Sequence, residues 1–447
     1  MQYKTSQYTY FIEDNSGSLR LYNSLRGSKS LFIVNPLLKT KIYTILNDCA
    51  SSKWNNDADF LKLYQNGFIV DEETNEISIG ETTKNDVVNY PGLMLTIMPT
   101  EDCNFRCVYC YEDHKKGKMS KTVQNSIIKF VQKNIRYYTE LNVGWFGGEP
   151  LDALDVIENL SKRLIDICNV ARKKYSAGMT TNGYNLDIDT FMLMQRLKVF
   201  DYQITIDSLK EIHDKYRCLK DGSGTFDKIV ENIENIHKLS RRSYKIDIRT
   251  NFTAESIEVL PQYLEFCEKL FGNDSRFSLF VHLVGNWGGD SVKAIDSKLI
   301  SNSAYSELLR EIISLKPNVS FRAHIRDLEP FHSKCYAALR NSYVIGSDGA
   351  IYKCTEGFDM LENRIGYLTE TGDMVIDKTK HRKWLDIEKN AGNNGCLQCA
   401  YWGCCLNGPC PKAKIIAKKQ DGTFCPRTRN SIHEIMLLLE NTLYQQF

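Results

Sequence analysis

The chain has 447 residues, a formal net charge of +2 and 25% charged residues, and this length suits two to four domains. So small a net charge gives no strong overall field for nucleic acid or an anionic membrane. No apolar run approaches the ~18 residues that span a bilayer, and the opening residues lack the apolar segment of a signal peptide. We therefore expect a cytoplasmic protein, in which fifteen cysteines indicate metal or redox chemistry rather than disulfides.

The first 72 residues have the pattern of a small separate unit, in which short strands precede two amphipathic helices. This order predicts a winged-helix-like module, which often binds DNA, but the segment 57–65, around the second helix, is not basic. Residues 73–90 are polar and are predicted to be a linker. The predicted elements are strands at Tyr8–Glu13, Leu19–Tyr22, Ser30–Val34 and Phe68–Asp71 and helices at Leu37–Leu46 and Asp57–Tyr64.

From Pro91 onward, strand-like runs alternate with segments of helical periodicity. Six such repeats predict an α/β fold with a parallel sheet covered by helices. The helical patterns centre on Ile127, Leu160, Met194 and Ile233. The predicted strands are Leu93–Met98, Asn142–Phe146, Ser176–Met179, Tyr202–Ile206, Lys245–Thr250 and Phe277–Val284.

Three cysteines follow the first of these strands within eight residues, at Cys103, Cys107 and Cys110. Three converging thiolates can hold three corners of a cubane [4Fe–4S] cluster and leave the fourth iron open to another ligand. Tyr109, just before the third cysteine, would lie flat beside that open corner. The alternatives are a zinc site, with His114 as the nearest further ligand, or buried structural cysteines.

This CxxxCxxC motif with an aromatic before its last cysteine resembles the signature of the radical S-adenosylmethionine (SAM) superfamily. The resemblance implies a partial (β/α)6 TIM-like barrel in which Cys103, Cys107 and Cys110 hold the catalytic cluster. It also implies that SAM chelates the open iron and is cleaved reductively to a 5′-deoxyadenosyl radical. After the second strand, Gly147-Gly148-Glu149 matches the family motif that holds the amino group of SAM, and two glycines let backbone approach a ligand closely.

Further family matches follow the third and fourth strands. Thr180–Gly183, which contains Asn182, matches the family, and residues 205–217 resemble a stretch of anaerobic sulfatase-maturing enzymes and peptide maturases. By position, Thr205 and Asp207 belong to the SAM site, and Arg217 pairs with the carboxylate of SAM, a role that suits a guanidinium. Ser208 stands where the family has glycine. We expect a structural role for the nearby His213.

The last third of the chain resembles the SPASM extension, whose seven cysteines bind two auxiliary [4Fe–4S] clusters. The resemblance implies a first cluster on Cys335, Cys354 and Cys410 and a second on Cys396, Cys399, Cys405 and Cys425. One extra residue before Cys410 leaves open whether Cys404 or Cys405 is a ligand. The fourth ligand of the first cluster is also open, with Cys404, His332 or a substrate thiolate as candidates. Zinc ribbons are the main alternative.

These motifs divide the chain into four predicted parts. A winged-helix-like peptide-recognition element with its linker occupies 1–85, the barrel 86–300, a bridging region 301–334 and the Cys-rich SPASM domain 335–447. Domains of the first kind, fused to peptide-modifying radical SAM enzymes, bind a leader peptide at a strand edge. The edges considered are Tyr8–Glu13 and Ser30–Val34.

The resulting hypothesis is a radical SAM maturase with three [4Fe–4S] clusters that crosslinks a ribosomally made precursor peptide. A thioether from a cysteine sulfur to carbon is the first choice and a carbon–carbon bond the second. Sulfatase-maturing enzymes have an aspartate base where this chain has Thr355, which argues against sulfatase maturation. Reduced flavodoxin or ferredoxin is the expected electron donor. The alternatives are action on a protein side chain or small molecule, or an iron–sulfur electron carrier or redox sensor.

Overall fold

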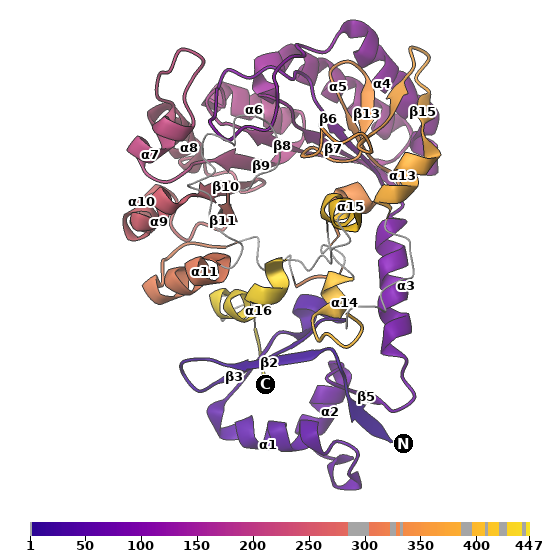
Figure 1. The fold of residues 1–447 in the computed structure, drawn as a ribbon, viewed down its shortest axis with the longest axis vertical. Coiled ribbons are helices and arrows are strands. Elements are labelled where there is room, and N and C mark those ends of the chain that lie inside the picture. Colours follow the sequence, from indigo (N-terminus) through magenta and orange to yellow (C-terminus); the bar gives the residue numbers. More distant parts are fainter. Residues whose placement is uncertain are drawn as a thin grey trace. The chain divides into compact units, whose positions relative to one another are not determined.

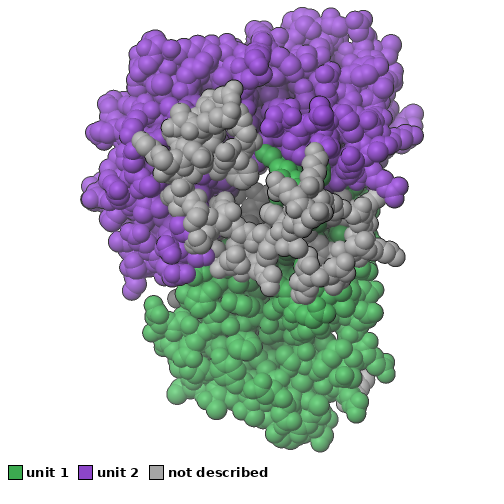
Figure 2. Space-filling view, in the orientation of Figure 1, with its two compact units in different colours: residues 1–89, 323–339, 385–447 green, residues 90–322, 340–384 purple. Residues whose placement is uncertain are grey.

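The computed structural model describes residues 2–284, 304–321, 328–330, 334–385, 396–406, 410–419, 427–439 and 444–447. The chain forms two compact units, which Figure 2 shows in different colours. Unit 1 comprises Met1–Asn89, Ala323–Leu339 and Leu385–Phe447, and unit 2 comprises Tyr90–Arg322 and Arg340–Trp384. None of the helices in the described ranges has the length and apolarity needed to cross a membrane.

Unit 2 is built on the six parallel strands that the sequence predicts, which lie side by side in chain order (Figure 1). Their side chains alternate between buried and partly exposed, as in β8, because one face of the sheet is covered by helices. The strands are β6 (Leu93–Ile97), β7 (Glu140–Trp145), β8 (Lys174–Thr181), β9 (Val199–Thr205), β10 (Lys245–Phe252) and β11 (Phe277–Leu283).

The connecting helices carry the periodic apolar positions expected from the sequence. In α5, for example, Val156, Leu160 and Leu164 are all buried. The helices of this unit are α4 (Lys121–Asn134), α5 (Leu154–Val170), α6 (Ile188–Arg196), α7 (Lys210–Tyr216), α8 (Phe226–His237), α9 (Ala254–Glu258), α10 (Leu260–Leu270), α11 (Ala304–Leu315) and α13 (Lys378–Trp384).

The sheet of unit 2 continues past β6 into a segment that lies late in the chain. Strand β12 (Ser342–Ile345) pairs parallel with β6, and an antiparallel series of β13 (Ala350–Tyr352), β14 (Arg364–Leu368) and β15 (Met374–Ile376) follows. These residues lie within the part that the sequence assigned to the Cys-rich domain. In the structure they belong to the same unit as the barrel strands.

Unit 1 contains the predicted strands and helices of the N-terminal segment. Strands β2 (Thr9–Glu13), β3 (Leu19–Asn23) and β4 (Phe32–Val34) form an antiparallel sheet. Helices α1 (Pro36–Asn47) and α2 (Ala58–Gln65) contribute Ile42, Ile45, Phe60 and Leu63 to a core shared with that sheet. Further described elements of this unit are β1 (Tyr3–Thr5), β5 (Ile69–Asp71), α14 (Trp402–Cys405), α15 (Pro411–Lys419), α16 (Arg427–Leu438) and β16 (Gln445–Gln446).

One of the two strand edges considered for peptide binding is occupied. The C-terminal strand β16 pairs parallel with β4, with Gln445 opposite Phe32, so the Ser30–Val34 edge is not open. Pairing between strands so far apart in the chain leaves no local signal in the sequence. Strand β2 lies at the end of this sheet, and among the described strands it pairs with β3 alone.

The predicted linker is wrong, because residues 73–90 contain helix α3 (Glu76–Val88). Asn75 caps it by accepting a hydrogen bond from the Ser78 N–H (3.0 Å). Its buried face is polar or small up to Lys84, before Val87 and Val88: Glu76 accepts from the Ser6 hydroxyl, and a Cβ on Gly80 would lie 2.2 Å from the Trp402 ring. A helix that packs through such residues has no apolar periodicity to detect.

Candidate functional site

The cysteine loop follows β6 and is fastened along its length to the segment after α7. The Arg106 N–H donates to the Cys218 carbonyl (2.8 Å), and the Val108 N–H donates to the Tyr216 carbonyl (3.0 Å). An isolated β-bridge also pairs Phe105 with Leu219. Segments about a hundred residues apart therefore fix the backbone that carries the three thiols.

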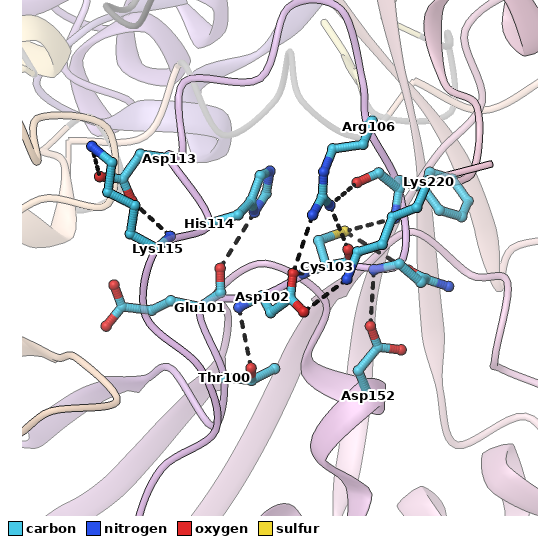
Figure 3. A network of polar contacts seen from close by, with 12 residues as sticks. Thr100, Glu101, Asp102, Cys103, Arg106, Asp113, His114, Lys115, Asp152 and Lys220 are labelled. Atoms are coloured by element: carbon cyan, nitrogen blue, oxygen red, sulfur yellow. Dashed lines mark hydrogen bonds and ion pairs between the residues drawn. The ribbon is translucent and has the colours of Figure 1, made fainter. Parts of the chain in front are cut away.

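Charged side chains reinforce the start of this loop (Figure 3). Asp102 forms ion pairs with Lys220 (2.7 Å) and Arg106 (3.4 Å), and the hydrogen bond from Lys220 lowers the pKa of Asp102. Asp152 accepts from the Asn104 N–H (2.9 Å). Because the ion pairs are exposed, each stabilises the loop only weakly.

The three thiols of the motif line one cavity of unit 2. Cys103 is buried, and its Sγ accepts from the Phe105 N–H (3.3 Å). Burial raises the pKa of all three thiols, that of Cys110 to about 12. They become thiolates only beside a strong positive charge, which a bound metal centre supplies.

The positions of the three thiols also bear on the alternative of a zinc site. Thiolates on one zinc ion, each about 2.3 Å from the metal, converge to within roughly 4 Å of one another. In the described part of the chain no three His, Cys, Asp or Glu side chains form such a single-ion site. His114 lies beside the loop, with Nε2 3.6 Å from the Cys110 Sγ and Nδ1 3.3 Å from the Glu101 carbonyl oxygen. Ligands of a cubane bind different irons and need no such convergence.

The two glycines after β7 contact the cysteine loop itself. The Gly148 N–H donates to the Thr100 carbonyl (3.2 Å). A Cβ on Gly147 would lie 2.2 Å from that same oxygen, and a Cβ on Gly148 would lie 2.1 Å from the Asp102 carbonyl oxygen. Gly147 also has φ +126°, a value that favours glycine. The glycines are therefore required by close backbone packing, a reason that differs from the ligand approach expected from the sequence.

Glu149 is fully buried behind the cavity wall. One carboxylate oxygen accepts from the Leu151 N–H (2.9 Å) and the Thr181 hydroxyl (2.7 Å), and the other accepts from the Asn182 N–H (2.7 Å). Burial raises its pKa to about 7 despite these donors. Glu149 thus joins the end of β8 to the glycine turn, and its predicted contact with a ligand amino group stays a prediction.

Tyr109 and Arg217 line the cavity in a shared polar network. The Arg217 Nη1 donates to the Tyr109 hydroxyl (2.7 Å), and that hydroxyl donates to the carboxylate of Asp207. Asp207 also accepts from the Asn251 N–H (2.8 Å) and lies outside the cavity lining. Its position makes it a support for Tyr109. The Nε of Arg217 is buried without a partner among the described residues.

His213 has the structural role expected for it. Its Nδ1 accepts from the Asp207 N–H (3.1 Å), and its Nε2 lies 3.1 Å from the Thr225 hydroxyl, which donates to the Arg217 carbonyl (2.6 Å). These contacts require a neutral ring protonated on Nε2. Burial lowers the pKa of His213 well below its usual value. Nearby Ser208 is buried with φ +69°, which explains glycine at this position in the family.

The cavity encloses about 1010 Å³ of empty space, part of it open to solvent. Glu149 and Asp207 are the predicted cofactor residues that do not line it. Arg249, Glu112 and Glu356 line it without having been predicted. Arg249 and Asn251 are two residues apart on one strand, so they share a face of the sheet, and both line the cavity. The predicted residues on its wall are Cys103, Cys107, Cys110, Tyr109, Gly147, Gly148, Asn182, Thr205 and Arg217.

The structure describes most of the C-terminal cysteines. Cys354 follows β13, and its Sγ accepts from the Glu356 N–H (3.3 Å). The Cys399 N–H donates to the Cys396 carbonyl (3.1 Å) in a tight turn.

The neighbouring ligand candidates Cys404 and Cys405 can be compared on burial. Cys404 is fully buried with its Sγ 3.4 Å from the Tyr401 carbonyl oxygen, whereas Cys405 is partly exposed, as are Cys335 and Cys410. Since Cys103 and Cys354 are also buried, burial alone leaves both candidates open. Cys425 and His332 lie outside the described residues.

Comparisons with known proteins agree with this geometry. Residues 97–267 match the Radical SAM superfamily. A cysteine-type anaerobic sulfatase-maturating enzyme of Clostridium novyi is 23% identical over 351 residues, which cover 71% of this chain and 87% of the relative. The radical SAM cyclopropyl synthase TigE of Paramaledivibacter caminithermalis is 24% identical over 259 residues, 51% of this chain and 53% of its own length.

Two solved structures share the fold. The structure of anSMEcpe with bound AdoMet and the Cp18Cys peptide has a TM-score of 0.61 at 22% identity and covers 79% of this chain and 98% of its own. Streptococcus suis SuiB bound to S-adenosylmethionine has a TM-score of 0.50 at 16% identity and covers 95% and 99%. Residues 97–267 therefore resemble a radical SAM domain, and a sulfatase-maturating enzyme is among the relatives of the chain.

Proposed function

We propose that this chain is a peptide maturase that installs a crosslink, most simply a thioether, in a ribosomally made precursor peptide. The single observation that carries the proposal is the cavity of unit 2, where three thiols, Tyr109 and a buried cation, Arg217, share one wall. The cavity is partly open to solvent, as access of a peptide side chain requires. Thr355, in place of an aspartate, argues against sulfatase maturation.

The residues present fit a [4Fe–4S] cluster and SAM. Cys103, Cys107 and Cys110 hold the cluster, and the unpartnered Nε of Arg217 suits the carboxylate of SAM. Tyr109 and Thr205 line the space beside them. When bound, the cluster and SAM supply a carbon-centred radical that abstracts hydrogen from a substrate C–H bond. The protein binds and orients the reactants and limits access of water.

Arg217→Ala tests the SAM assignment. This variant should weaken SAM binding and SAM cleavage together while the iron content stays that of wild type. Arg217→Lys keeps the charge but loses the planar fork, so it should restore part of the affinity. Unchanged SAM affinity in Arg217→Ala would refute the assignment.

The cysteine pattern of the last third supports two auxiliary [4Fe–4S] clusters, three in all. Iron analysis of anaerobically reconstituted protein should then give about twelve irons per chain. A variant with Cys103, Cys107 and Cys110 changed to Ala should lose about one third of them. A wild type that holds zinc, or iron for one cluster alone, would contradict this count.

We further propose that unit 1 binds the leader part of the precursor at β2, the strand edge left open in its sheet. Phe11, on β2, is 43% exposed, which is unusual for a side chain of this size. Phe11→Lys should impair modification of the full-length precursor encoded beside the enzyme but leave a leaderless core peptide unaffected. Leu37→Lys, at a more exposed site on α1, is the matched control. Equal processing by both variants would count against the edge.

Two further assignments complete the proposal. Reduced flavodoxin or ferredoxin in the cytoplasm supplies the electron.

The second candidate product is a carbon–carbon crosslink. Mass spectrometry of the modified peptide after thiol alkylation distinguishes the two products, because a thioether consumes one free cysteine and a carbon–carbon bond consumes none. A wild type that holds its clusters but never cleaves SAM would instead indicate an electron carrier or redox sensor.

A further inference from the structure

Arg249 lies on β10 and lines the same cavity as the cysteine motif. Within the parallel sheet its register partners are Thr205 on β9 and Phe280 on β11. The neighbouring Ile248 and Thr250 point away into the buried face and are fully buried. The alternation of the strand therefore directs Arg249 to the cavity side of the sheet.

Two contacts hold the guanidinium of Arg249 in place. Its Nε donates to the Asn251 Oδ1 (2.9 Å), and its guanidinium carbon lies 5.7 Å from the centre of the Phe280 ring. The amide of Asn251 is itself oriented, because its Nδ2 donates to the Asp207 carboxylate (3.1 Å). The Arg249 side chain is thus preorganised by a chain of hydrogen bonds and a cation–π contact.

The charge of Arg249 has no counterion among the described residues. Among those residues its side chain has one hydrogen bond, from Nε, and one ring contact, so neither terminal nitrogen has a hydrogen-bond partner there. The two carboxylates that share the cavity wall, Glu112 and Glu356, form no ion pair with it. By contrast, Arg276 pairs with Asp274 at 2.7 Å. A partly buried cation without an anion is costly.

We propose that Arg249 binds a carboxylate in this cavity through its two terminal nitrogens. A planar guanidinium with a fixed Nε presents a fork that matches a carboxylate in two parallel hydrogen bonds. Two sources have this chemistry: the amino-acid end of SAM, and an acidic or C-terminal group of the substrate peptide. Only the identity of these two carboxylate sources depends on the proposed function.

The test uses cluster-loaded enzyme and three small probes under anaerobic conditions. Calorimetry measures the affinity of S-adenosylhomocysteine, which has the amino-acid end, and of 5′-methylthioadenosine, which lacks it. Saturation-transfer NMR then measures N-acetylglycine, a minimal peptide carboxylate, on enzyme already loaded with S-adenosylhomocysteine. The variants are Arg249→Gln, which keeps a similar shape without charge, and Arg249→Lys. Arg242→Gln is the control, since Arg242 is exposed just before the same strand.

If the carboxylate belongs to SAM, Arg249→Gln weakens S-adenosylhomocysteine binding by about 10- to 100-fold, the usual range for a charged hydrogen bond. Binding of 5′-methylthioadenosine then stays at the wild-type level. If it belongs to the peptide, both nucleosides bind as before and the N-acetylglycine signal is lost. Arg249→Lys gives an intermediate loss in either case, and Arg242→Gln gives none.

Wild-type affinities for all three probes in Arg249→Gln overturn the proposal. The same holds if wild type gives no N-acetylglycine signal and the variant leaves nucleoside binding unchanged. Failure of wild type to bind S-adenosylhomocysteine counts against the proposed function instead, and N-acetylglycine then tests Arg249 separately. Matching visible spectra and iron contents for the variants show that the fold and clusters are intact.

Discussion

Gly148→Ala tests whether the glycine turn exists to seat the cysteine loop. The added Cβ would lie 2.1 Å from the Asp102 carbonyl oxygen and 3.0 Å from the Cys103 nitrogen. Both neighbours are backbone atoms of the loop, so the clash is not relieved by rotating a side chain. The loop must move until the shorter contact reaches at least 3.0 Å. Overpacking of this kind costs on the order of 3 kcal/mol.

The displaced backbone is the one that carries Cys103, so cluster binding should suffer before SAM binding. We expect Gly148→Ala to lose about one third of the iron, as the cysteine triple variant does. Its free energy of unfolding should also fall in urea titrations. Gly144→Ala is the matched control, because a Cβ there meets its nearest atom, the Thr96 Oγ1, at 3.5 Å. Full iron content in Gly148→Ala with SAM affinity alone reduced would refute this reasoning and favour direct ligand approach.

Three further predictions follow from the site and its surroundings. Ser208→Gly should raise the free energy of unfolding by about 1 kcal/mol, because it relieves a positive φ and removes a buried hydroxyl without a partner among the described residues. Ser208→Ala removes the hydroxyl but keeps the backbone strain, so it should stabilise less, and an equal gain in stability would contradict the backbone argument. Tyr109→Phe should lower the free energy of unfolding by about 1–2 kcal/mol, since Asp207 and Arg217 each lose a hydrogen-bond partner. The iron content should stay unchanged, and a loss of iron would show instead that the hydroxyl holds the cluster loop. Burial lowers the pKa of His381 to about 4, below its unfolded value of about 6.5. The unfolded state therefore binds an extra proton between these values, and the free energy of unfolding falls by up to about 3 kcal/mol as the pH drops from about 6.5 to about 4. In urea titrations at pH 4.5 and 7, His381→Gln should reduce this difference in stability between the two pH values, and an unchanged difference would contradict the prediction.

The sequence predicts the barrel strands well because apolar side chains recur at alternate positions within short segments, as in β6, β8 and β10. It misses helix α3, because Glu76, Gly80 and Lys84 occupy buried positions over most of its length and only Val87 and Val88, at its end, are buried and apolar. It also misses the pairing of β12 with β6 and of β16 with β4, because strands distant in the chain leave no local pattern.

In the site, too, the sequence predicts features that depend on local spacing and misses those that depend on contacts between distant residues. The cysteine spacing locates the loop, and Arg217 and Thr205 do line the cavity with it. The roles of Glu149 and Asp207 could not be read from spacing, since both depend on which donors surround the carboxylate. Arg249 was missed because its significance lies in the absence of a counterion among the described residues, which only the assembled sheet reveals.

The most direct test of the central claim is reductive cleavage of SAM. Anaerobically reconstituted wild-type enzyme, given dithionite and SAM, should release 5′-deoxyadenosine, measured by liquid chromatography and mass spectrometry. The variant with Cys103, Cys107 and Cys110 changed to Ala should release none above the protein-free background. Absence of 5′-deoxyadenosine from fully loaded wild type, or equal release by the triple variant, would contradict the assignment of this cavity as a radical SAM site.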